Sequence, residues 1–74
     1  MQAIEQEKIP DQETLDAAEK AYSLDPENPV IIDTLALTYY HAGMKELACR
    51  TIQKAYKIGK DDQVIKNHFQ KICF

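Results

Sequence analysis

The chain has 74 residues, of which 45% are hydrophobic and 28% are charged, with two glycines, three prolines and no tryptophan. This length corresponds to one domain, and the apolar content is too high for a disordered polypeptide. A net charge of −3 argues against nucleic-acid binding, and no apolar run approaches the ~20 residues of a membrane-spanning helix.

Residues 1–9 are expected to be flexible or the remnant of a helix. They include Glu5 and Glu7 and no apolar run, so they do not resemble a secretory signal. Residues 10–74 are expected to form a single helical domain. Two cysteines are too few for a disulfide-dense scaffold, so we expect a reducing compartment and a cytoplasmic protein.

Glycines and prolines divide residues 10–74 into four segments. Asn28 offers a capping side chain directly before Pro29, whose backbone suits the first position of a helix. Gly43 and Gly59 each follow a helical stretch, at the position where glycine adopts the left-handed conformation that ends a helix. The helices are therefore expected at about residues 10–24, 29–42, 45–58 and 62–73.

Apolar side chains recur with a helical period in all four segments. In the second segment Ile32, Leu35 and Tyr39 lie on one face, and no segment sustains the alternation of a strand. Asp61 or Asp62 can cap the last helix. Because the links are short, consecutive helices should pack antiparallel, which predicts an all-α fold of three to four helices.

A shift of 34 residues aligns the chain with itself. Lys20-Ala21-Tyr22 aligns with Lys54-Ala55-Tyr56, and Val30-Ile31 aligns with Val64-Ile65. Such a period belongs to repeated helix–turn–helix units.

The segment 29–62 carries a family motif. Leu35-Ala36, Tyr39 and Gly43 stand at its Leu-Gly, aromatic and turn positions, and the second helix supplies Ala48, Ile52 and Ala55. With the 34-residue period, the chain resembles the tetratricopeptide-repeat (TPR) family over about residues 10–74. The resemblance implies a fragment of an α-solenoid, with a full repeat at about 29–62 and a solvent-facing final helix at about 62–73.

The resemblance also implies a binding face, because the first helix of each TPR lines a concave groove. Exposed Leu37 and Tyr40 would form an apolar anchor for a partner; alternatively, a neighbouring helix or a second copy covers them. The acidic Asp33, where chaperone-binding members use a lysine, argues against capture of the chaperone C-terminal Glu-Glu-Val-Asp peptide. The groove residues implied are Val30, Asp33, Leu37, Tyr40, His41, Asn67 and Lys71.

Family stacking would bring Cys49 near Cys73. The sequence favours two reduced and buried thiols, with a disulfide as the alternative. His41 and His68 bring the number of potential zinc ligands to four, but the short paired spacings of zinc sites are missing. Surface histidines and packed cysteines are the favoured interpretation, and we expect no metal and no cofactor.

The sequence lacks a nucleophile motif and a phosphate-binding loop, so no enzyme activity is expected. The expected function is a non-catalytic interaction module, a scaffold or adaptor that binds a protein or peptide through the groove. Two alternatives stay open: an auxiliary segment of a larger enzyme or of a secretion or assembly factor, and a self-association unit. Neither a nucleic acid nor a membrane is expected as partner.

Charge is distributed unevenly along the chain. Residues 1–43 hold two lysines and nine acids, and residues 44–74 hold seven basic residues and three acids. The favoured interpretation is two solvated helical surfaces, and the alternative is head-to-tail contact between copies. Because stacked repeats need about three units to bury a continuous core, we expect association between copies or with a partner.

Overall fold

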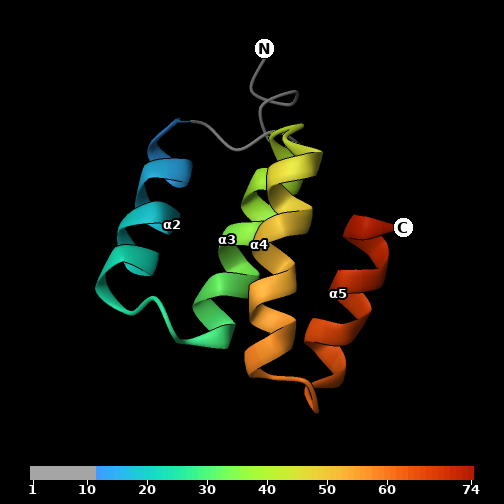
Figure 1. Ribbon diagram of the computed structural model, residues 1–74. Coiled ribbons are helices and arrows are strands. Elements are labelled where there is room, and N and C mark those ends of the chain that lie inside the picture. The colour runs from blue at the N-terminus through green and yellow to red at the C-terminus, as the bar shows by residue number, and fades with distance from the viewer. Residues whose placement is uncertain (1–11) are drawn as a thin grey trace.

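A computed structural model describes residues 12–74, which form four α-helices and no strands (Figure 1). The prediction of an all-helical fold is confirmed for these residues, and the expectation for residues 1–9 lies outside them. The helices are α2 (Gln12–Leu24), α3 (Pro29–His41), α4 (Lys45–Ile58) and α5 (Gln63–Cys73).

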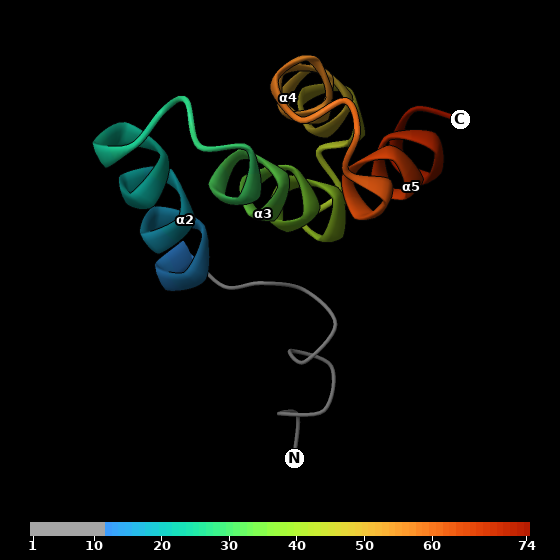
Figure 2. The same ribbon diagram turned by 90° about the horizontal axis from the view of Figure 1, so that it is seen from below.

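Each helix runs antiparallel to the one before it (Figure 1). Helix α3 lies at the centre, with α2 on one side and α5 on the other, and α4 covers one side of the α3–α5 pair (Figure 2). The end-on view therefore shows two surfaces of different make-up. One is formed by α3 and α5, and on the other α4 and α2 flank α3.

Small side chains let α3 and α4 approach closely. Ala36 on α3 and Ala48 and Ala55 on α4 are completely buried, and Ile52 fills the space between them. Helix α5 extends this core with Ile65 and Ile72, while α2 contributes partly buried side chains only. The apolar stripes predicted for the last three helices thus form one continuous core, to which α2 is added at the edge.

Helix ends recur at the interval of 34 residues. Helices α2 and α4 end at Leu24 and Ile58, and helices α3 and α5 begin at residues 29 and 63. The caps repeat as well: the Asn28 side chain accepts hydrogen bonds from the two backbone N–H groups at residues 30 and 31, and Asp62 accepts them from residues 64 and 65. The sequence repeat is therefore also a repeat of local structure.

The two glycines end their helices for different reasons. Gly43 has a φ of 86°, and the N–H groups of Gly43 and Met44 donate to the carbonyls of Tyr40 and Tyr39. This is the left-handed helix end that the sequence predicted. For Gly59 that prediction is wrong, because its φ is −114°. A Cβ there would lie 3.3 Å from the Ile65 side chain, so Gly59 is needed for its small size.

The structure joins Cys49 and Cys73 in a disulfide, with their Cα atoms 5.0 Å apart. The favoured interpretation of two reduced thiols is therefore wrong, and the alternative applies. Two cysteines 24 residues apart carry no signature of a bridge in sequence, because their proximity arises only when α5 packs on α4. The argument for a reducing compartment from free thiols is lost with them.

Candidate functional site

The seven residues predicted to line a groove differ in exposure. Val30 is 61% exposed, and the helix-end residue His41 is also exposed. Leu37 and Tyr40 are half-buried and pack against the core. On α5, Asn67 and Lys71 are exposed. Asp33 departs from the prediction, because it is only 8% exposed.

Asp33 is buried because it pairs with a histidine of the neighbouring helix. Nδ1 of His68 lies 2.9 Å and 3.0 Å from the two carboxylate oxygens of Asp33. The sequence assigned His68 to the surface and Asp33 to the open groove. A helical period places each residue on its own helix, but it does not show that residue 33 of α3 faces residue 68 of α5.

Tyr40 is the second point at which α3 meets α5. The Nζ atom of Lys71 lies 6.0 Å from the centre of the Tyr40 ring, at the outer limit of a cation–π contact. The imidazole of His41 meets the same ring edge-on, with 5.6 Å between the ring centres. Tyr40 thus presents its ring between two groups that carry or accept a proton.

We call the residues Leu37, Tyr40, His68 and Lys71 the α3–α5 face. The Asp33–His68 pair and the Tyr40–Lys71 contact connect the two helices side by side along this face. The structure does not bring all the predicted residues into it. The Asn67 side chain instead accepts a hydrogen bond from Gln63 on its own helix, at 3.0 Å.

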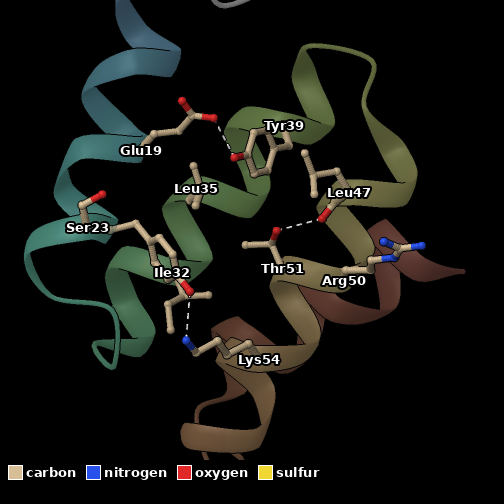
Figure 3. Close-up of a pocket in the computed structure, with 10 residues that line it drawn as sticks. Glu19, Ser23, Ile32, Leu35, Tyr39, Leu47, Arg50, Thr51 and Lys54 are labelled. Atoms are coloured by element: carbon tan, nitrogen blue, oxygen red, sulfur yellow. Dashed lines mark hydrogen bonds between the residues drawn. The ribbon is translucent and has the colours of Figure 1, made fainter.

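Sequence reasoning missed a hollow on the opposite surface. It lies between α2 and α4, has a volume of about 430 Å³, and is floored by Ile32, Leu35 and Tyr39 of α3 (Figure 3). On its walls the Tyr39 hydroxyl donates to Glu19 at 2.8 Å, and Lys54 donates to the Tyr22 hydroxyl at 2.9 Å. The sequence had assigned the acids of the first helix, including Glu19, to a solvated surface. The hollow is open and its floor residues are themselves core residues, so it is a seam between helices.

Two pKa shifts belong to this hollow. Burial, and then the hydrogen bond and negative charge of Glu19, raise the pKa of Tyr39 to about 12. The hydrogen bond to the Tyr22 hydroxyl, with a smaller contribution from Glu27, raises the pKa of Lys54. Both groups keep their protons at neutral pH, so they act here as hydrogen-bond donors that connect helices.

The described residues offer little for chemistry beyond binding. In residues 12–74 no three His, Cys, Asp or Glu side chains gather where they could hold a metal ion. The Asp33–His68 pair orients an imidazole, as catalytic pairs do. Both cysteines, however, are in the disulfide, and the hydroxyls of Thr34, Thr38 and Thr51 donate to backbone carbonyls of their own helices. None of the four helices is long and apolar enough to cross a bilayer.

Comparison with protein-family models, with curated proteins and with solved structures finds no match to this chain.

Proposed function

We propose that the chain is a non-catalytic protein–protein interaction module of the TPR type, which binds a protein or peptide partner through the α3–α5 face. The observation that carries the proposal is the structural period of 34 residues. Both interhelical caps and two pairs of helix ends recur at that interval. A period that appears in hydrogen bonds as well as in sequence is what a stacked repeat requires.

The packing of α3 on α4 supports the same proposal. The small residues Ala36, Ala48 and Ala55 are buried between the two helices, where the TPR motif places its small side chains. Helix α5 then lies beside α3, in the position that the first helix of a following repeat would take.

The α3–α5 face has the composition of a contact surface. Leu37 and Tyr40 retain exposed apolar area, and tyrosine is among the residues that contribute most binding energy in protein interfaces. The carboxylate of Asp33 is already paired with His68, so it places no unpaired acid in the path of a partner. Lys71 adds a cation at the Tyr40 end.

Self-association is the second candidate, and the charge distribution favours it. Residues 12–28, with α2, hold one lysine and five acids, whereas α4, α5 and their link hold seven basic residues and three acids. Complementary charge at opposite ends of a molecule favours head-to-tail contact. Cytoplasmic localisation stays a prediction.

Parallel affinity capture from a native extract tests the leading proposal. Wild-type protein is compared with Tyr40→Ala and Leu37→Asp on the α3–α5 face, and with Leu47→Asp as a matched control. Leu47 is 43% exposed and lines the hollow on the other surface. Circular dichroism confirms that each variant is folded.

We expect one set of proteins to be retained by the wild type and by Leu47→Asp and to be lost with both α3 variants. Loss with Leu47→Asp alone would move the binding surface to the hollow and contradict the proposal. A turnover that survives purification and depends on one polar residue would contradict the non-catalytic assignment.

A further inference from the structure

We propose that the Cys49–Cys73 disulfide is a redox-controlled clamp that holds α5 against α4 and thereby completes the α3–α5 face. This inference rests on the proposed function of that face and adds a means of regulating it. The bridge opens when a dithiol reductant reaches it and closes again by oxidation.

The position of the bridge makes it a clamp. The N-terminal end of α5 is attached to α4 through the short link at residues 59–62, and Asp62 caps it. At the opposite end, Cys73 is the last residue of α5, and the bridge joins it to the second turn of α4. Helix α5 is therefore held covalently at both ends, and opening the disulfide leaves a single attachment.

Without the bridge, α5 depends on a small set of non-covalent contacts. Ile65 and Ile72 are buried, and the Phe69 ring stacks on Tyr56 with 4.9 Å between the ring centres. The helix has only 11 residues, which is shorter than the ~12–15 at which isolated helices become stable in water. The terminal residue Phe74 is 86% exposed, so it adds little packing at the freed end.

The freed end carries half of the face. Lys71 lies in the last turn of α5, next to buried Ile72, and His68 lies one turn earlier. When the last turn frays, Lys71 leaves the Tyr40 ring, and the Asp33–His68 contact is the next to lose its support. Opening the bridge therefore dismantles the face from its Tyr40 end, while α2, α3 and α4 keep their packing.

The chemistry is thiol–disulfide exchange. A thiolate of the reductant attacks one of the two sulfurs, the bond between Cys49 and Cys73 breaks, and a mixed disulfide forms. The second thiol of the reductant then displaces it, so that the protein gains two thiols and the reductant becomes a cyclic disulfide. Both cysteines are only partly buried, which gives a small dithiol access to the bridge.

Amide hydrogen exchange of the full chain tests the clamp. Oxidised wild-type protein is compared with protein reduced by dithiothreitol, and the Cys49→Ser/Cys73→Ser double variant is the control. Intact mass must show the oxidised form to be two protons lighter than the reduced form. We expect reduction to accelerate exchange at residues 68–73 about tenfold or more, with smaller changes at residues 63–67 and in α3. The double variant should exchange at the reduced rate with or without dithiothreitol.

Three results would overturn the clamp: a mass that shows free thiols in the untreated protein, α5 exchange that is unchanged on reduction, or equal loss of protection in all four helices. The last result would mean that the bridge supports the whole fold. These readouts need no partner, so they separate the clamp from the proposed function. Capture with oxidised and reduced wild type completes the test: recovery of the partners lost with Tyr40→Ala should fall at least about fivefold on reduction, and equal recovery would overturn the regulation.

Discussion

The Asp33 carboxylate is the one buried charged side chain among residues 12–74, and both of its oxygens face the same nitrogen of His68. Removing one member of a buried pair leaves the other without a partner in a poorly solvated position, which costs more than the pair itself contributes. Because the His68 side chain is 27% exposed, the penalty is reduced by access of water.

We therefore expect His68→Ala to lower the free energy of unfolding by about 2 kcal/mol in urea denaturation. The matched control is His41→Ala, which removes an exposed histidine and should change stability by less than about 0.5 kcal/mol. Equal losses in the two variants would show that the Asp33–His68 pair contributes nothing specific.

Tyr39 predicts a pH dependence at the alkaline end. Burial and Glu19 raise its pKa to about 12, whereas the unfolded chain ionises it near the ordinary value of 10. Below pH 10 both states are protonated and the interaction is fully present. Between pH 10 and pH 12 only the unfolded state releases the proton, so stability falls as pH rises, by roughly 2–3 kcal/mol at most.

Lysines and other tyrosines also titrate in this range, so the measurement is a difference. Urea denaturation from pH 8 to pH 12 should show a steeper loss for the wild type than for Tyr39→Phe. Parallel curves would mean that the folded protein does not hold the Tyr39 proton.

Contacts between residues far apart in sequence were the part that sequence could not supply. The apolar period correctly placed Tyr39 in the core, but Glu19, twenty positions earlier, was assigned to solvent. Rules of helix spacing describe pairs three or four residues apart on one helix. The partners of Asp33 and Tyr39 lie on other helices, and only the packing of α3 against α2 and α5 brings them within reach.

At the scale of the elements, the two glycines give a paired prediction. Gly43→Ala places a Cβ in the left-handed region at a φ of 86°, and it should lower the free energy of unfolding by about 1–2 kcal/mol although the space there is open. Gly59→Ala has an ordinary φ, and its new Cβ meets the end of the flexible Ile65 side chain. We expect a change of under about 1 kcal/mol, measured by thermal and urea unfolding. A larger loss at Gly59 than at Gly43 would contradict the different roles given to them.

The helices themselves were largely predictable, and the reason is local. Asn28, Pro29 and Gly43 act through their own backbone and near neighbours, so their meaning is readable in sequence, and the helix bounds agree with it. The disulfide was not, because it depends on how α5 packs on α4. The α3–α5 face stands between these cases. A helical period places Leu37 and Tyr40 on one side of α3, but the identity of the facing α5 residues required the structure.

For the whole molecule, association follows from size and charge. A domain of about 60 residues buries only about 60% of its unfolded surface, and acidic α2 stands opposite basic α4 and α5. We expect the chain to associate with a second copy or with its partner. Sedimentation across a concentration range at low and high salt measures the first case, in which the mean mass should rise with concentration and fall with salt. A monomer at high micromolar concentration with one cooperative thermal transition would show that these helices suffice without a partner.

The most direct measurement of the binding surface is a nuclear magnetic resonance titration of isotope-labelled chain with a partner that the wild type captures and Tyr40→Ala loses. The account predicts that shift changes gather on the α3–α5 face, at Leu37, Tyr40, His68 and Lys71, while Leu47 and Thr51 in the hollow stay unchanged. Changes centred on the hollow between α2 and α4, with the α3–α5 face unaffected, would contradict it.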